Sequence, residues 1–189
     1  MDYVDDKMNA QGRQIEKDNE ALRSAVEDFN KNGSYEKYKA IAEMLWNSTV
    51  CVPLKMALSK EAEAVLAAVN EREDKTFTAE EDAVLKKGME PCPMTVKGKD
   101  GRKYFFVFTS EKEIGDNFKY DIAHPDPFSR VVAMILNLEH KPDTVVLNPF
   151  THSFEIECKT LKAMLALKSG DKKLLKEAME ESEAEKEER

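Results

Sequence analysis

Two hydroxyl residues, Thr109 and Ser110, follow the aromatic stretch GRKYFFVF at residues 101–108. Hydroxyls between a strand and a helix start can attack an acyl or phosphoryl group, or can join free backbone N–H groups in holding an anion. Ser110 and Glu113 also have the S-x-x-E spacing of a capping box, which satisfies N–H groups at a helix start. No glycine flanks Ser110 as a nucleophile elbow requires. We therefore predict a helix cap here, with anion binding as an open alternative.

Three histidines, His124, His140 and His152, are the only imidazoles of the chain. His124 lies two residues before Asp126, so the pair could share a metal or a proton. Two ligands do not make a site, and we interpret this segment as a loop that leads into a helix. His152 is adjacent to Ser153, but no acid or oxyanion donor can be identified for a hydrolase mechanism. We therefore predict no metal site and no catalytic residues.

The segment LNPFTHSF, residues 147–154, has features of a recognition surface. Asn148-Pro149 must end the preceding strand, and Phe150 is then carried on a connection that usually lies at the surface. An exposed aromatic residue on a loop marks contact with a partner more often than catalysis. The alternative is that Phe150 packs beneath the final helix. The predicted partner-binding or ligand-binding edge consists of Thr109, Ser110, Asn148, Pro149, Phe150 and His152.

Cofactor motifs do not accompany these residues. The seven glycines are scattered, and neither the dinucleotide motif G-x-G-x-x-G nor the P-loop motif G-x-x-x-x-G-K occurs. Cys51, Cys92 and Cys158 lie far apart, without the close C-x-x-C pairs of a zinc site. We predict that the cysteines are reduced and buried, and we expect no cofactor.

The length and charge of the chain limit its class. A chain of 189 residues suits one domain, and its net charge of −8 would repel a phosphate backbone. The longest uncharged runs, residues 44–54 and 144–154, are far shorter than the roughly 20 apolar residues of a spanning helix. Met1 is followed by acidic residues instead of the basic and apolar regions of a signal peptide. We expect a cytoplasmic protein that binds neither membrane nor nucleic acid.

Hydrophobic spacing predicts the elements of the first half of the chain. An amphipathic stripe over residues 15–29 predicts a helix that ends at Gly33, and a second helix begins at Ser34 to form an αα-hairpin. The run STVCVPL, residues 48–54, predicts a buried strand whose pairing is limited by its proline. Two more helices are predicted over residues 59–70 and from a capping box that begins at Thr78.

Turn signals and alternation predict the second half. Asp100-Gly101 predicts a hairpin whose second arm, residues 102–108, is apolar on both faces and is therefore a central strand. Asp126-Pro127 predicts the start of a helix, with Asp126 as its N-cap. Two strands are predicted over residues 144–147 and 154–158, before a last helix. The fold class is mixed α/β, with one central sheet of about five strands flanked by helices.

The chain divides into three predicted parts. Residues 1–13 are polar and aperiodic, which predicts a flexible arm, and residues 14–170 form the α/β domain with a helical insertion at about 55–90. Residues 171–189 are acidic and have nothing to bury after Met179. We expect this tail to be frayed or disordered, although its first part could extend as a helix.

Four motifs occur in order: Asn19-x-x-Leu22-x-x-Ala25, a strand that ends in Val52-Pro53, DGRKYFFVFTSEKEI from Asp100, and VVLNPFT from Val145. Together they resemble the amino-terminal domain of the SseB family, the enhanced serine sensitivity proteins, over about residues 19–167. The resemblance implies a mixed α/β domain of bacterial origin whose biochemical activity is not established, and it offers no catalytic residues to transfer. The helical insertion after Pro53 departs from the family pattern.

We predict a non-enzymatic module that binds a protein or peptide of unknown identity through the edge that gathers Thr109, Ser110 and residues 148–152. The alternative is a small hydrolase or transferase, or a small-anion-binding protein, that uses the helix start at Thr109 and Ser110. A hydrolase or transferase would need two groups among Ser110, His124 and His152 within hydrogen-bond reach. The oligomeric state is left open.

Overall fold

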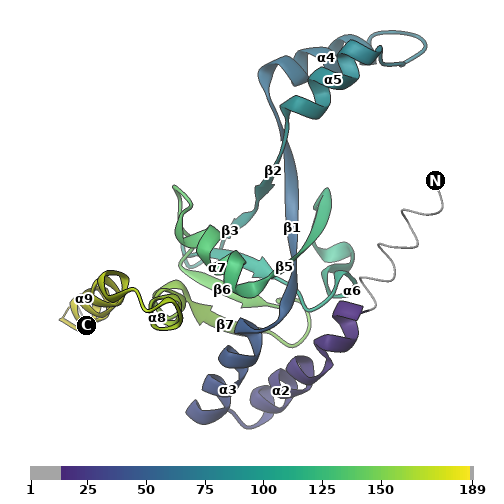
Figure 1. Ribbon diagram of the computed structural model, residues 1–189. Helices are drawn as coiled ribbons and strands as arrows, with labels where there is room; N and C mark the ends of the chain where they lie inside the picture. Colours follow the sequence, from purple (N-terminus) through teal and green to yellow (C-terminus); the bar gives the residue numbers. More distant parts are fainter. Residues whose placement is uncertain (1–13, 188–189) are drawn as a thin grey trace.

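The computed structural model describes residues 14–187 (Figure 1). The predicted flexible arm, residues 1–13, lies outside the described residues. The helices are α2 (Glu20–Lys31), α3 (Tyr35–Trp46), α4 (Lys60–Asn70), α5 (Ala79–Gly88), α6 (Glu111–Ile114), the 3-10 helix η1 (Gly115–Asn117), α7 (Phe128–Leu136), α8 (Cys158–Ser169) and α9 (Lys172–Glu187). The strands are β1 (Thr49–Leu58), β2 (Met89–Pro93), β3 (Thr95–Lys97), β4 (Lys103–Val107), β5 (Ile122–Pro127), β6 (Thr144–Leu147) and β7 (Phe154–Glu157).

The mixed α/β class is confirmed, but the strands of the described residues are divided between two sheets. One sheet has the order β2-β1-β5, and the other has the order β3-β4-β6-β7. All pairs are antiparallel except β4 and β6, which run parallel. The sheets meet where the backbones of Cys51 and Phe108 exchange two hydrogen bonds of 2.8 and 3.0 Å.

Strand β4 lies inside its sheet and is covered on both faces, as its sequence predicts. On one face, Phe105 and Val107 are fully buried in the larger core, which combines residues from α2, α3, α7 and α8 with residues of both sheets. On the other face, Phe106 and Phe108 belong to a smaller core around Ile114. The chain that follows β4 therefore starts from the buried Phe108, while Phe106 on the same face stays partly exposed.

Most predicted helix starts are confirmed. The Ser34 hydroxyl accepts a hydrogen bond from the backbone N–H of Lys37 at 3.2 Å. The Thr78 hydroxyl and the Glu81 carboxylate form the predicted capping box. The predicted hairpin joins β3 to β4, and Gly101 takes the positive φ of 84° that this turn requires.

Strand β1 is longer than predicted. It continues past Pro53 to Leu58, and Pro53 pairs with Ala123 of β5. The backbone groups of even-numbered β1 residues point toward β5, as shown by the Leu54 carbonyl, which accepts from the backbone N–H of Asp121. The nitrogen of Pro53 is directed to the other side, where the ladder with β2 begins only at Leu54. Proline is tolerated there because no donor is needed.

Residues 122–127 form strand β5, so the prediction of a loop with Asp126 as helix N-cap is wrong. Pro127 occupies the N-cap position of α7, and its side chain makes no capping bond. The Asp126 carboxylate instead pairs with Arg130, at 3.2 Å between Oδ1 and Nη1. The prolines of this segment argued against a strand in the sequence, because a strand tolerates proline only where the proline nitrogen points to an unpaired outer edge.

The predicted insertion stands away from the body of the molecule. The distal part of β1 pairs with β2 to form a two-stranded ribbon, and this ribbon carries α4 and α5 at its far end (Figure 1). We call residues 54–93 the projecting arm. At the other end of the chain, α9 packs against α8 with Ala178 buried. Among residues 14–187, the helices are too short or too polar to cross a bilayer.

Candidate functional site

Thr109 and Asn148 lie side by side because they follow adjacent parallel strands. Val107 at the end of β4 pairs with Leu147 at the end of β6. The Asn148 side-chain oxygen accepts from the backbone N–H of Thr109 at 2.9 Å, and its amide donates to the Thr109 hydroxyl at 3.0 Å. Both residues are buried. The structure thus joins the two segments that were predicted to form one edge.

Asn19 links this pair to the rest of the molecule. Its side-chain amide donates to the backbone carbonyls of Thr49 at 2.7 Å and of Thr109 at 2.9 Å. Asn19 is buried, with 1% of its surface exposed. The sequence indicated Asn19 only as part of a family motif, and its hydrogen bonds to two distant backbone carbonyls were not predicted. The signal was a polar residue on the same apolar stripe as Ile15 and Leu22.

The loop after β6 turns sharply at Asn148, whose φ is 46°. Asparagine adopts this left-handed conformation more readily than most residues. The backbone N–H of Asn148 donates to the Val107 carbonyl at 2.9 Å, and its carbonyl accepts from the N–H of Thr151 at 3.2 Å. These two backbone hydrogen bonds fix the path that residues 149–151 take away from the sheet.

Phe150 lies on an aromatic cluster instead of beneath the final helix. Its ring centroid is 6.0 Å from those of Phe106 and Phe108 and 6.4 Å from that of Phe118. Phe150 nevertheless keeps 39% of its surface exposed. We call Phe106, Phe118 and Phe150 the aromatic patch, since Phe106 and Phe118 are also partly exposed.

Charged and polar groups surround the aromatic patch. The Thr151 hydroxyl donates to the Glu113 carboxylate at 2.7 Å, and the Tyr120 hydroxyl donates to Glu111 at 3.3 Å. Burial raises the pKa of Tyr120, and the negative charges of Glu111 and Asp116 raise it further. These hydrogen bonds place two carboxylates, Glu111 and Glu113, at the rim of the patch, while the neighbouring Lys112 is paired with Glu16.

His152 lies at the surface beyond this rim. Its Nε2 atom is 3.6 Å from the Glu27 carboxylate of α2. Pro149 is half-buried between Asn148 and Phe150. Of the six residues predicted for this edge, three are thus buried (Thr109, Ser110 and Asn148), and three reach the surface (Pro149, Phe150 and His152).

Comparison with known proteins agrees with these motifs. The family model described as the SseB protein N-terminal domain matches residues 22–163. The chain belongs to the SseB family. The matched region contains the predicted edge and the whole projecting arm. In the comparisons with curated proteins and with solved structures, nothing matched.

Ser110 of this SseB-family domain does not form the predicted capping bond. Helix α6 begins after Ser110, as expected, but it has only four residues and no side-chain cap. The Glu113 carboxylate is instead bonded to Thr151. The Ser110 hydroxyl is buried and has no hydrogen-bond partner among residues 14–187.

The histidines do not complete a reactive site with Ser110. Its hydroxyl bonds to neither His124 nor His152. His124 pairs with Val52 on β5. Within the described residues, no three side chains of His, Cys, Asp or Glu are grouped as a metal site would require. What the arrangement offers is a supported aromatic surface with an acidic rim.

Two of the three cysteines are buried, as predicted, and all three are free thiols. Burial raises the pKa of Cys51 to about 11, with a smaller contribution from the charge of Glu111. Burial also raises the pKa of Cys158 to about 11, with a smaller contribution from Asp143. Both thiols are therefore protonated at neutral pH and are poor nucleophiles. Cys92 differs, because it is half-exposed on β2 of the arm.

Proposed function

We propose that this SseB-family domain binds a protein or peptide, without transforming it, through the aromatic patch and the loop at residues 149–152. The observation that carries this proposal is the position of Phe150. Its ring is supported from below by three other phenylalanine rings, yet 39% of its surface faces solvent. Aromatic side chains that are held in place and still accessible are frequent energetic centres of protein interfaces.

Pre-organisation of the loop supports the proposal. A loop that is ordered before binding loses less conformational entropy when the partner arrives. The Thr109–Asn148 pair and the Asn19 amide hold the start of the loop from below. In this proposal, Thr109 and Asn148 are positioning residues because they are buried, and Phe150 and His152 contact the partner.

The acidic rim suggests the chemistry of the partner. Glu113 is hydrogen-bonded to Thr151 beside Phe150, and Glu111 is hydrogen-bonded to Tyr120; the phenylalanine rings can accept an apolar side chain or a cation over their faces. We therefore propose a segment with an exposed apolar residue next to lysine or arginine. Electrostatic attraction would speed its association and weaken as salt is added.

Site-specific crosslinking tests the proposal. A benzophenone amino acid is placed at position 150, and at position 35 as the matched control, since Tyr35 is 72% exposed on α3. The crosslinked products from native cells are identified by mass spectrometry. We expect one recurring partner at position 150 that is absent at position 35. Identical products at the two positions, or only self-crosslinks, would contradict the proposal.

Quantitative binding to the identified partner then tests the role of the ring. Phe150→Ala should weaken binding by at least about 2 kcal/mol, roughly thirtyfold, if the ring is an interface centre. Tyr35→Ala should leave the affinity unchanged. Equal affinities for wild type and Phe150→Ala would show that the partner binds elsewhere.

A further inference from the structure

The projecting arm has one face that is entirely apolar. Leu54, Met56 and Leu58 lie on the same side of β1, because alternate residues of a strand share a face. Their cross-strand partners also point to that side. We call the following residues the ribbon face: Leu54, Met56, Leu58, Met89, Pro91, Pro93 and Ile122.

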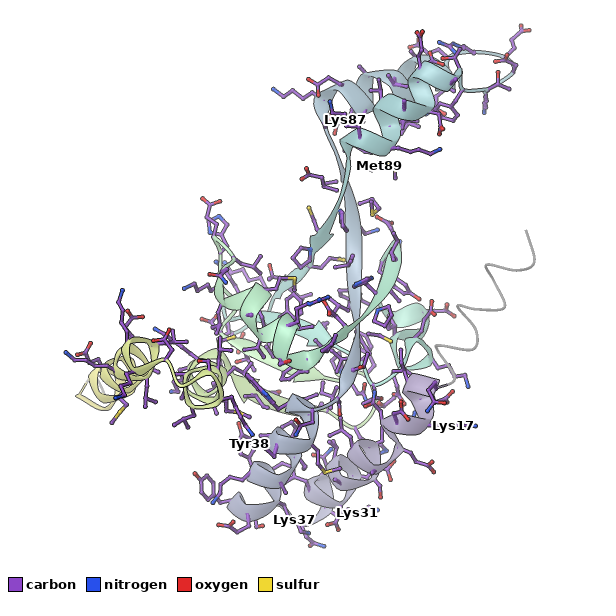
Figure 2. The ribbon with its side chains drawn as sticks, in the orientation of Figure 1. Lys17, Lys31, Lys37, Tyr38, Lys87 and Met89 are labelled. Atoms are coloured by element: carbon purple, nitrogen blue, oxygen red, sulfur yellow. The ribbon has the colours of Figure 1, made fainter. Side chains whose placement is uncertain are left out.

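The ribbon face continues the core face of the sheet beyond the body. Val50 and Val52 lie on the same side of β1 and are buried in the larger core. On the neighbouring strands, Met89 of β2 is 40% exposed and Ile122 of β5 is 42% exposed. Figure 2 shows Met89 at the far end of the ribbon, next to α5 and away from the helices of the body. A hydrophobic surface thus runs out from the core and becomes more exposed along the ribbon, since Leu54 is buried, Met56 and Leu58 are half-buried, and Met89 is exposed.

The opposite side of the ribbon is mixed, because the pairs Lys55–Cys92 and Ala57–Glu90 each place one charged residue beside a small uncharged one. Lys55 lies there, and its ammonium group is 2.9 Å from the Asp121 carboxylate. Ala57 pairs with Glu90 on the same side. The two sides therefore differ in charge: charged groups occur only on this mixed side of the ribbon, and an exposed apolar side of this kind is typical of a contact surface.

The arm also has little support of its own. An isolated two-stranded ribbon is marginally stable, and so are helices as short as α4 and α5. In the helical end of the arm, Ala62 and Val69 are the buried residues of α4, and α5 has none. A partner packed on the ribbon face would bury more apolar surface and so stabilise the projecting arm.

Edge pairing cannot provide that coverage. The backbone N–H groups of Glu90 and Cys92 point toward β1. The nitrogens of the alternate residues, Pro91 and Pro93, therefore point to the outer edge of β2. Pro125 and Pro127 have the same orientation on the outer edge of β5. These edges lack the N–H donors that an added strand would need. A partner must therefore pack on the face.

The charges at the two ends of the ribbon are opposite. The loop between α4 and α5 and the first turn of α5, residues 71–82, have six acidic and two basic residues. The β3–β4 hairpin, residues 97–103, has four basic residues and one acidic residue, and it follows β2 after a single residue. Lys97 and Lys99 form no ion pair with any residue in the range 14–187. Two arms laid antiparallel would bring each acidic end toward a basic hairpin.

We propose that the occupant of the ribbon face is a second copy of this chain. The two arms cross antiparallel about a twofold axis near Met56 and Pro91, so that each apolar face covers the other. Such a contact is isologous and closes as a dimer. It is separate from the aromatic patch, and neither proposal depends on the other.

Mass measurement by sedimentation equilibrium is the first test. The wild-type chain of 21.5 kDa should associate to twice that mass as concentration rises. The double variant Met89→Glu/Ile122→Glu should dimerise at least tenfold more weakly. Leu167→Glu is the matched control, since Leu167 is 67% exposed on α8 and lies off the arm. A wild-type mass of one chain throughout, or equal dimerisation by the double variant, would overturn the proposal.

Crosslinking at the axis is the second test, and it does not require a destabilising change. A residue near a twofold axis meets its own counterpart. Met56→Cys, in a Cys92→Ser background, should form a disulfide-linked dimer on mild oxidation, whereas Leu167→Cys in the same background should not. A partner of different sequence, captured at position 56 in place of a second copy, would also overturn the proposal.

Charge reversal tests the antiparallel arrangement. Glu73→Lys/Glu80→Lys should weaken the dimer, and adding Lys97→Glu/Lys99→Glu to the same chain should restore it. Failure of the second pair to restore dimerisation would exclude this orientation. Circular dichroism of each variant confirms that the fold is retained.

Discussion

Asn148 and Thr109 form a closed side-chain pair at the ends of two parallel strands. The Asn148 oxygen accepts from the Thr109 backbone N–H at 2.9 Å, while its amide donates to the Thr109 hydroxyl at 3.0 Å. Both groups are buried, so each would lose hydrogen bonding if the other were removed. The pair therefore couples the stability of the sheet to the shape of the loop that carries Phe150.

Asn148→Ala should lower the free energy of unfolding by about 2–4 kcal/mol. The change leaves the Thr109 N–H buried without a partner, and alanine is strained at a φ of 46°. Asn148→Gly should cost less, because glycine relieves the backbone strain but not the lost bonds. Urea unfolding followed by circular dichroism measures both. An Asn148→Ala variant as stable as wild type would show that the pair has no structural role.

Asn19→Ala should lower the free energy of unfolding by about 1–3 kcal/mol, because two backbone carbonyls lose their donor. Asn30→Ala is the matched control. Asn30 also donates to a backbone carbonyl, that of Ser153 at 3.2 Å, but it is exposed, and its loss should cost less than about 0.5 kcal/mol. Equal effects of the two changes would contradict the importance assigned to the buried amide.

Glu81 should titrate far below the usual range of a glutamate. The hydrogen bond from Arg72 is the largest cause, followed by the backbone N–H of Thr78, and together they lower the pKa of Glu81 to about 2. The depressed pKa means that the contribution of Glu81 to the stability of the projecting arm is complete above the usual glutamate pKa of 4.5 and is lost as the pH falls toward about 2. Carboxyl NMR titration measures this pKa, and Arg72→Ala should raise it. An unchanged pKa in that variant would remove Arg72 as the cause.

The three thiols should react in a defined order. Cys92 should be alkylated first, because it is half-exposed, while Cys51 and Cys158 should react only on unfolding. The pKa values of Cys51 and Cys158 in the folded protein, about 11, exceed the usual thiol value of 9.0, so their contribution to stability is complete below about pH 9 and is lost as the pH rises toward 11. Mass spectrometry after alkylation at neutral pH gives the order. Modification of Cys51 in the native protein would contradict its burial.

Local features of the sequence were sufficient to predict much of the fold. The Thr78 capping box, the turn at Gly101 and the apolar alternation of β4 are determined by neighbouring residues, and each is confirmed. The family was also recognisable, because its motifs occur in order along the chain. These features depend on backbone propensity and on hydrophobic periodicity, which a short segment carries by itself.

Long-range pairing was not visible in the same way. The segment around His124 looked like a loop, and only pairing with β1 makes it a strand. The capping box predicted for Ser110 is absent, since the Glu113 backbone N–H donates to the Ser110 carbonyl and the Glu113 carboxylate accepts from Thr151, which is distant in sequence. The division of the strands between two sheets likewise depends on the contact of Cys51 with Phe108.

The sequence by itself determined the elements, the family and the residues that end neighbouring strands. Only the tertiary structure decided that Asn148 is buried against Thr109, that Phe150 rests on three other rings, and that the ribbon face extends beyond the core. The physical reason is that a side chain's environment is set by contacts between segments far apart in the chain, and a strand's own residues do not specify what covers its faces.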